Sequence, residues 1–407
     1  MTKKLYLNGA IIDVKHGSVW QKGGMMTDGE RITAVGRAED FPNVPDGAPG
    51  CEIVDCSGKT IMPGLINGHV HLFMEPYTWD RLAYQSEPLS SLCLRILDNM
   101  KKTLHSGVTF VRDLGGVANL DVEFRNYVEE GRAEGPGMFC ARRPLTITGG
   151  HAADFSAACD GPAEFIKGTR EQIRGGADLI KIMPTAGYAR PKMRVNHSMI
   201  ADTAYMSPEE IKAAADEAHR FGRKIAAHCC GLTGVKNAVL NGVDSIEHGQ
   251  LLAPKSDEAK RIASEMAERG IWLVPTLSAF FKEYPRAEVE EKYVPVIESF
   301  RMYHESGVKI AMGTDAGVPW VGHDKAARET QHMSLYGMSA MEAIAASTIR
   351  PAEMMGIDGE YGSIDAGKFA DFLILDEDPL CDIAALGRTM QVFKHGAPVA
   401  GGAGNKM

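Results

Sequence analysis

Four histidines and one aspartate stand where short apolar segments of the chain end. His69 and His71 follow the apolar approach IMPGLING. Because residues two apart on an extended chain point to the same side, both imidazoles can bind one ion. Three more candidates end later apolar segments: His228 ends KIAAH, His248 ends DSIEH, and Asp315 ends KIAMGTD. Imidazoles and carboxylates are ligands of zinc and similar divalent ions, so this pattern predicts a metal site.

Lys181 interrupts the apolar run LIKIM, which is typical of a buried central strand. In one interpretation its side chain snorkels out of the strand end into water. In the other, burial lowers the pKa of the amine, the neutral amine takes up carbon dioxide, and the resulting carbamate bridges two metal ions as a carboxylate would. The five other candidate ligands favour the second interpretation.

The elements that must position these residues alternate between strands and helices from about residue 61 onward, which is the rhythm of βα units around a parallel sheet. Between the fourth and fifth strands, Ser207 is predicted to cap a helix that has Pro208 in its first turn and ends at Gly222. Eight strands predict a (β/α)8 barrel, in which the carboxyl ends of the strands converge on one mouth. The expected strands are Thr60–Leu65, Val108–Asp113, Met138–Arg142, Leu179–Met183, Ile225–His228, Ser245–His248, Trp272–Thr276 and Lys309–Asp315.

Both ends of the chain have β character. The first sixty residues contain short strands separated by Asn-Gly, Asp-Gly and Gly-Gly turns. After the eighth strand, one helix is expected from the Ser339 cap to a break at Pro351, and strands then return. Neither end has enough strands to bury a face alone, so residues 1–60 and 356–407 are expected to form one small β-sandwich domain beside a barrel of residues 61–355.

Composition narrows the class of protein. The 407 residues are 44% hydrophobic, and 44 basic against 53 acidic residues give a net charge of -9. No basic cluster is long enough to track phosphates, which argues against nucleic acid as a partner. Asn8 and Gly9 interrupt the first apolar run, no stretch is apolar enough to span a bilayer, and the eight cysteines lack disulfide spacing, so a cytoplasmic protein with free thiols and no membrane partner is expected.

Taken in order, the segments MPGLINGHVHL, LIKIM, AAH, SIEHG and GTDAG resemble the amidohydrolase superfamily. The later segment AASTIRPAEMMG, followed by GSIDAGKFADFLILDEDPL, is similar to its terminal signature. The ligand set resembles the binuclear branch related to Xaa-Pro dipeptidases, N-acyl amino acid carboxypeptidases and imidazolonepropionases. The resemblance implies two divalent ions, expected to be zinc, with a buried ion on His69, His71 and Asp315, a more exposed ion on His228 and His248, and carbamylated Lys181 between them.

The same resemblance implies the catalytic groups. A hydroxide bridging the two ions would attack an amide carbonyl, and Asp315 would take its proton and pass it to the leaving nitrogen. His151 lies in a GGH motif whose imidazole, in relatives, contacts the substrate carbonyl or the oxyanion. A solvated loop histidine is the alternative. Iron, manganese or cobalt could fill the same ligands.

The substrate is expected to be a dipeptide, an N-acyl amino acid or a related amide. Tyr188 and Arg190, in a long polar loop after Lys181, and Cys230, where relatives carry an aromatic residue or a histidine, are the substrate-binding candidates. The departure at Cys230 weakens the dipeptidase prediction and also fits a less ordinary acyl amino acid or a xenobiotic amide. The alternative activities are a mononuclear deaminase or cyclic-amide hydrolase, or a lactonase or esterase of the same superfamily. A deaminase would usually carry Glu at Gly231, and a non-catalytic scaffold would have lost ligands. Such barrels often pair, so a homo-oligomer is expected.

Overall fold

The computed structural model describes residues 3–41, 51–77, 83–186, 202–388 and 390–399. The chain divides into two compact units. Unit 1 comprises Met1–Asn67, Met100–Phe110 and Asp324–Met407, and unit 2 comprises Gly68–Asn99 and Val111–His323. The domain boundaries expected near residues 60 and 356 follow a change in sequence pattern, whereas this division follows spatial proximity, and those boundaries stay a prediction.

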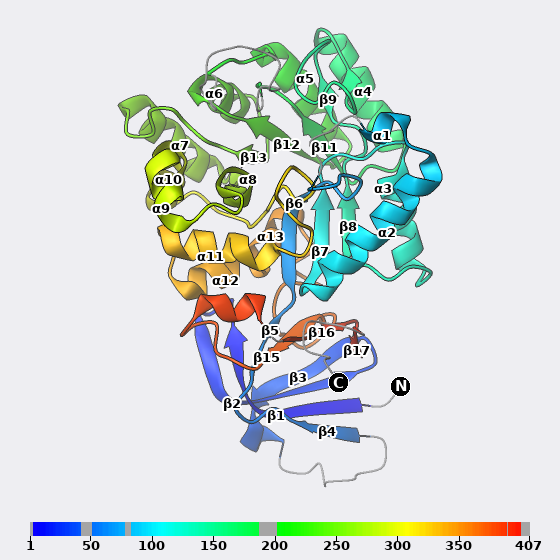
Figure 1. Cartoon of the computed structure of the whole chain (residues 1–407), viewed down its shortest axis with the longest axis vertical. Helices are drawn as coiled ribbons and strands as arrows, with labels where there is room; N and C mark the ends of the chain where they lie inside the picture. The colour runs from blue at the N-terminus through cyan, green and yellow to red at the C-terminus, as the bar shows by residue number, and fades with distance from the viewer. Residues whose placement is uncertain (1–2, 42–50, 78–82, 187–201, 389, 400–407) are drawn as a thin grey trace. The chain divides into compact units, whose positions relative to one another are not determined.

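Unit 1 contains an eight-stranded sheet built from both ends of the sequence (Figure 1). The strand order is β17-β16-β15-β5-β1-β2-β3, and β4 pairs with β1. β5 joins the two ends, because it runs parallel to β1 and antiparallel to β15. The strands are β1 (Lys3–Asp13), β2 (Ser18–Asp28), β3 (Arg31–Arg37), β4 (Cys51–Asp55), β5 (Thr60–Pro63), β15 (Phe372–Leu375), β16 (Met390–Lys394) and β17 (Ala397–Pro398).

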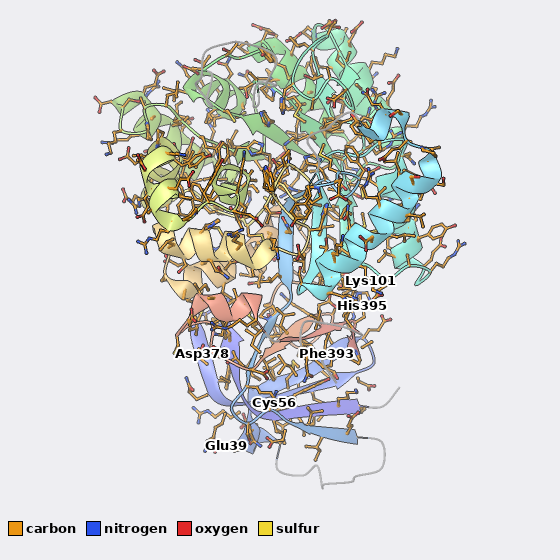
Figure 2. All side chains as sticks on the ribbon, in the orientation of Figure 1. Glu39, Cys56, Lys101, Asp378, Phe393 and His395 are labelled. Carbon is orange, nitrogen blue, oxygen red and sulfur yellow. The ribbon has the colours of Figure 1, made fainter. Side chains whose placement is uncertain are left out.

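The strands of this sheet contribute to a cluster of buried aromatic and aliphatic side chains. Phe372 and Phe393 stack with ring centroids 4.4 Å apart, and Tyr6 meets Phe372 edge to face at 5.1 Å. Figure 2 labels Phe393 among these side chains. β3 is the last strand in this order. Its residue Arg31 forms an isolated bridge with Phe369, which lies just before β15 in the chain. The two faces expected of a sandwich therefore belong to one continuous hydrogen-bonded sheet.

Unit 2 is organised around parallel strands. One sheet has the order β10-β9-β11-β12-β13-β14, and every pair in it is parallel. A second sheet has the order β6-β7-β8, and its first two strands have residues in both units. The strands are β6 (Leu65–Val70), β7 (Val108–Asp113), β8 (Gly137–Cys140), β9 (Leu145–Thr146), β10 (Ala157–Ala158), β11 (Leu179–Ile182), β12 (Lys224–Cys229), β13 (Ser245–His248) and β14 (Trp272–Val274).

Backbone hydrogen bonds within unit 2 link residues of the two sheets at two places. β8 bonds to the residue that precedes β11, and the segment 309–315 bonds to both β14 and β6. The links are Asp178 N to Cys140 O at 2.8 Å, Leu273 N to Lys309 O at 2.8 Å, and Asp315 N to His69 O at 2.9 Å.

Two of the expected strands are wrong in detail. The segment expected as Thr60–Leu65 is divided at Gly64, with β5 pairing in unit 1 and β6 beginning at Leu65. The break occurs because the Gly64 N–H donates to Asp371 O, and a Cβ at Gly64 would collide with Thr109. The segment Lys309–Asp315 forms only an isolated bridge, at Ile310, and ends in a left-handed residue, since Asp315 has φ +62°.

The helix Pro208–Arg220 begins after Ser207, as the sequence predicts. The Ser207 hydroxyl accepts from Glu210 N–H, and the Glu210 carboxylate accepts in return from the backbone of Ser207, which is a capping box. The helix expected from Ser339 to Pro351 is wrong, because the chain forms two helices that separate at Ser347 and Thr348. Pro351 lies in the first turn of the second helix, where its missing N–H breaks no hydrogen bond.

The helices connect and flank the strands (Figure 1). None of the described helices is long and apolar enough to cross a membrane. The eight cysteines are free thiols, as expected. The helices are α1 (Ala83–Ser86), α2 (Leu89–His105), α3 (Leu120–Glu129), α4 (Pro162–Arg174), α5 (Pro208–Arg220), α6 (Leu232–Leu240), α7 (Asp257–Arg269), α8 (Leu277–Phe281), α9 (Arg286–Lys292), α10 (Val294–Glu305), α11 (Ala326–Tyr336), α12 (Ala340–Ala346) and α13 (Ile349–Met355), with 3-10 turns at Ala38–Asp40 and Ile383–Gly387.

Gly313 lets the segment before Asp315 approach β6. A Cβ there would lie 2.8 Å from Cβ of His69 and would also collide with Val274. Gly313→Ala should therefore lower the free energy of unfolding by about 1–3 kcal/mol through overpacking. Urea unfolding measures this. Gly359→Ala, where an added Cβ would meet no atom of the described residues within 4 Å, should change stability by less than about 0.5 kcal/mol. Equal effects of both substitutions would contradict this reading of the close approach.

Candidate metal centre

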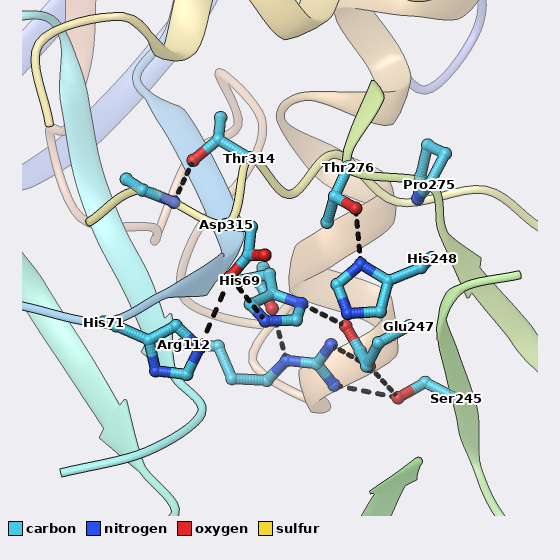
Figure 3. A network of polar contacts seen from close by, with 12 residues as sticks. His69, His71, Arg112, Ser245, Glu247, His248, Pro275, Thr276, Thr314 and Asp315 are labelled. Carbon is cyan, nitrogen blue, oxygen red and sulfur yellow. Dashed lines mark hydrogen bonds and ion pairs between the residues drawn. The ribbon is translucent and has the colours of Figure 1, made fainter. Parts of the chain in front are cut away.

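His69, His71 and Asp315 form one buried cluster. The Nε2 atoms of both imidazoles lie 3.3 Å from Oδ1 of Asp315 (Figure 3). One ligand atom from each residue lies within 4.8 Å of the others, so the three can hold one metal ion. Two imidazole nitrogens and a carboxylate oxygen are a donor set that suits zinc and related ions.

The backbone places these three side chains. His69 belongs to β6 and His71 follows its end, so the two side chains share a direction with a period of two residues. Asp315 takes a left-handed backbone conformation with φ +62°, while its N–H donates to the His69 carbonyl at 2.9 Å. Non-glycine residues in this region are uncommon and concentrate where function requires a particular side-chain direction.

Lys181, His228 and His248 come from the neighbouring parallel strands β11, β12 and β13. The rings of His228 and His248 lie 4.6 Å apart, and the His248 ring lies 5.1 Å from that of His69. The structure thus brings these histidines into one group with the first cluster. Lys181 belongs to the same environment, because the charge of Asp315 acts on its ammonium.

Two buried polar atoms here stand out among the described residues. Lys181 Nζ and His228 Nε2 have no hydrogen-bond partner within the part of the chain that the structure describes. A buried polar atom without a partner costs free energy, and such atoms are rare in folded proteins. Both atoms fit a group that binds among the strand ends and supplies the missing interactions. A metal ion is such a group for an imidazole nitrogen.

Burial lowers the pKa values of the basic side chains of this site, so that a larger fraction of them is neutral near pH 7 than in water. Burial and the neighbouring His151 lower the pKa of His228 well below its usual value. Burial also lowers the pKa of His248 well below its usual value, against the pull of Asp315. The pKa of the Lys181 ammonium falls to about 8, chiefly because it is buried. Neutral imidazoles and a partly neutral amine have lone pairs available for binding.

Asp315 behaves in the opposite way. Burial alone would raise the pKa of its carboxyl, but the charges and hydrogen bonds of His69 and His71 hold that pKa well below its usual range. The side chain is therefore a carboxylate that can only accept hydrogen bonds or bind a cation.

A buried ion pair that sequence reasoning missed holds His69. The Nδ1–H of His69 donates to Oε2 of Glu247 at 2.9 Å, and Arg112 Nη2 donates to Oε1 of the same carboxylate at 2.7 Å (Figure 3). Ser245 adds a 2.7 Å hydrogen bond to Oε1, and Arg112 Nε donates to the Gly68 carbonyl at 2.6 Å. The sequence marks each residue as unusual, since a charged residue interrupts the apolar strands SIEH and VTFVRD just as Lys181 interrupts LIKIM, but it does not show that the two residues pair.

This ion pair determines the tautomer of His69. Burial alone would raise the pKa of Glu247, but Arg112 and the hydrogen bond from His69 outweigh it and hold the pKa well below its usual range. An ionised Glu247 can only accept, so Nδ1 of His69 carries the hydrogen and its Nε2 lone pair faces Asp315. Carboxylates in this position orient metal-binding histidines and increase their basicity.

Two more of the candidate ligands, His71 and His248, have different partners on Nδ1. The Nδ1 atom of His71 lies 3.3 Å from the carbonyl oxygen of Gly115, which can only accept. The Nδ1 atom of His248 lies 2.7 Å from the hydroxyl oxygen of Thr276. Sequence reasoning also missed these contacts, because they join residues far apart in the chain.

The remaining candidates lie around this group. The His151 ring stacks on that of His228 at 4.2 Å with an interplanar angle of 25°. Cys230 is buried, its thiol donates to Gln250 Oε1 at 3.6 Å, and burial raises the pKa of the thiol to about 12. Tyr188 and Arg190 lie outside the described residues, so their predicted contact with substrate stays a prediction.

Known proteins resemble this chain over most of its length. The profile of the Amidohydrolase family matches residues 60–399, a range that contains the six candidate metal ligands. An ochratoxinase from Aspergillus niger is 28% identical over 364 residues, which cover 79% of this chain and 71% of that protein. An imidazolonepropionase from Mesorhizobium japonicum is 26% identical over 386 residues, covering 88% and 87%. A crystal structure of a Xaa-Pro dipeptidase with methionine bound in its active site is 30% identical, with a TM-score of 0.81 over 98% of this chain and 99% of that chain.

Glu247→Gln keeps the size of the side chain but leaves the buried Arg112 without its counter-charge. At about pH 7 the variant should lose about 3–5 kcal/mol of stability. Because the folded pKa of Glu247 is depressed, the carboxylate stabilises the wild-type fold above its unfolded pKa of about 4.3. This contribution is lost as the pH falls below that value toward the folded pKa, so the gap between the two proteins should narrow there.

Urea unfolding at several pH values measures this gap. Glu258→Gln is the matched control, because Glu258 pairs with Lys236 at the surface, and it should cost less than about 1 kcal/mol. A gap between wild type and Glu247→Gln that stays constant with pH would show that the charge of Glu247 does not stabilise the fold.

Proposed function

Because this chain belongs to the amidohydrolase family, we propose that it is a binuclear metal-dependent hydrolase that cleaves the amide bond of a dipeptide or an N-acyl amino acid. Family membership makes it a hydrolase that acts on carbon–nitrogen bonds. The observation that carries the binuclear proposal is the buried Lys181 amine, which has no hydrogen-bond partner among the described residues and lies beside a complete cluster of His69, His71 and Asp315. A single ion on that cluster would leave no role for Lys181.

The proposal includes a closed (β/α)8 barrel. Its support is the series of backbone hydrogen bonds that joins β8 to the segment before β11, β14 to residues 309–311, and residues 314–316 to β6. In the proposed barrel, eight chain segments would follow one another around a ring. The candidate ligands are near the carboxyl ends of those segments, which is where active sites of such barrels lie.

Two sets of ligands are proposed. His69, His71 and Asp315 would hold one ion, and His228 and His248 would hold the other. Lys181 would join them after its neutral amine nitrogen bonds to the carbon of carbon dioxide and releases a proton, which gives a carbamate with two oxygen ligands. A pKa near 8 supports this step, because an appreciable fraction of the amine is then neutral near pH 7.

Zinc is the proposed metal, and iron, manganese or cobalt would fit the same donors. When bound, two such ions would supply a nucleophilic water at neutral pH and polarise the scissile carbonyl. Asp315 would accept the proton of the attacking water and then deliver it to the leaving nitrogen, which departs poorly unless protonated. His151, stacked on His228, is proposed to donate to the oxyanion that develops on the carbonyl.

The proposed substrate class rests on the related proteins and on the local site. The Xaa-Pro dipeptidase that this chain resembles acts on dipeptides, as its name states. Cys230, Tyr188 and Arg190 are proposed to contact the substrate, and the neutral Cys230 thiol would present no charge to it. The likeness to imidazolonepropionase keeps a cyclic-amide hydrolase as the second candidate. A homo-oligomer remains part of the proposal.

Lys181→Ala removes the proposed bridge between the ions. Elemental analysis should find about two ions per wild-type chain and about one or none per variant chain, with hydrolysis lost. Added short carboxylic acids should restore part of both. Lys224→Ala, at an exposed lysine on the adjacent β12, should keep metal and activity. Unchanged metal content and activity in Lys181→Ala would contradict the bridging role.

A substrate panel separates the candidate activities. Dipeptides with varied C-terminal residues and N-acyl amino acids should be hydrolysed, while Asp315→Asn, which lacks the proton acceptor, serves as the background. Lactones, simple esters, cyclic amides and aminated heterocycles complete the panel. Hydrolysis confined to esters would remove the amide assignment, and hydrolysis confined to cyclic amides would favour the second candidate.

A further inference from the structure

Thr276 has a backbone conformation that its side chain disfavours. Its φ and ψ are both 46°, in the left-handed region, and it is fully buried. For a β-branched residue this conformation is a genuine outlier, because the branched Cβ crowds the backbone. Strain of this kind persists only where the surroundings impose it, and it concentrates at functional sites.

The side chain of Thr276 also does not cap the helix that follows it, although its position is that of a capping residue. Thr276 immediately precedes α8 (Leu277–Phe281), where a threonine hydroxyl usually accepts a hydrogen bond from the first turn. Ser207, Ser256 and Ser339 do so at their own helices, with extended backbones whose φ values are -72°, -66° and -64°. The Thr276 side chain makes no such cap hydrogen bond.

The hydroxyl is instead directed at His248. Thr276 Oγ1 lies 2.7 Å from His248 Nδ1, and both side chains are buried (Figure 3). If Oγ1 accepts, Nδ1 carries the hydrogen and the Nε2 lone pair is free to bind an ion. If Oγ1 donated, Nε2 would carry the hydrogen and could not bind one. His248 itself has φ +70°, so both partners of this contact lie in the left-handed region.

Neighbouring groups hold the turn in place. The carbonyl of Pro275 accepts from Gln250 Nε2 at 3.1 Å, and the carbonyl of Thr276 accepts from Ala279 N–H at 3.0 Å. Gln250 in turn accepts from the Cys230 thiol at 3.6 Å. The strained turn is therefore fixed from the side of β12 as well as from α8.

We infer that Thr276 is a positioning residue, which fixes the ring plane and tautomer of His248 so that its Nε2 binds the second metal ion. The inference rests on the proposed function, because it requires an ion at His248. The hydroxyl of Thr276 would orient the imidazole of His248 through Nδ1, as the Glu247 carboxylate orients that of His69. A neutral partner leaves His248 a less basic ligand than His69.

Four substitutions separate the hydroxyl from the backbone strain. Thr276→Ser keeps the hydroxyl, Thr276→Val keeps the shape without it, and Thr276→Ala and Thr276→Gly remove both the hydroxyl and the methyl group. Competition with a zinc chelator measures the affinity for the more weakly held ion. That affinity should fall about 10- to 100-fold in the Val, Ala and Gly variants and stay close to wild type in the Ser variant.

Thermal unfolding at saturating zinc tests the strain. Thr276→Gly should melt at a higher temperature than Thr276→Ala, since glycine enters the left-handed region without a Cβ penalty. A Val variant that holds the second ion as tightly as wild type, or an Ala variant that melts above the Gly variant, would overturn the inference while leaving two ions in place. A wild-type protein with fewer than two zinc ions at saturation would instead refute the proposed function and, with it, this role of Thr276.

Discussion

The hydrogen-bonded ion pair of Arg112 and Glu247 is the interaction on which the candidate metal centre depends. A buried charge without its partner is strongly destabilising, so each of these residues requires the other. Their shared network reaches His69 in two places, since Glu247 accepts from its ring and Arg112 donates to the carbonyl of Gly68, the preceding residue. One ion pair thus fixes both the backbone next to His69 and the imidazole of this candidate ligand.

The charge balance around this pair explains why the site suits cations. Among the groups described at the centre, Asp315 and Glu247 stay ionised, while burial pushes His228 and His248 toward their neutral forms. Arg112 balances one of the two carboxylates, and the charge of Asp315 is left without balance once the Lys181 amine has lost its proton. The remaining negative charge and the free lone pairs of neutral imidazoles together favour a divalent ion. Desolvation therefore prepares the ligands as much as their geometry does.

Features that depend on residues close together in the chain could be predicted from the sequence, whereas features that depend on contacts between distant residues could not. The HVH spacing was readable because residues two apart on a strand point to the same side. The other candidate ligands were readable because parallel strands end at the same edge of a sheet. Ser207 capped its helix as expected, because capping involves residues three apart. Pro351 misled, since a proline that ends one helix and one that begins the next look alike in sequence. The partnership of Arg112 and Glu247 spans 135 residues, and the left-handed backbone of Thr276 depends on packing, so neither could be read from local pattern.

Diffraction from crystals of the zinc-loaded protein, recorded on both sides of the zinc absorption edge, tests the binuclear centre most directly. The account predicts two anomalous peaks, one among His69, His71 and Asp315 and one beside His228 and His248. It also predicts additional density on Lys181 Nζ that reaches both peaks. A single peak at the first cluster, with an unmodified Lys181 amine, would contradict it.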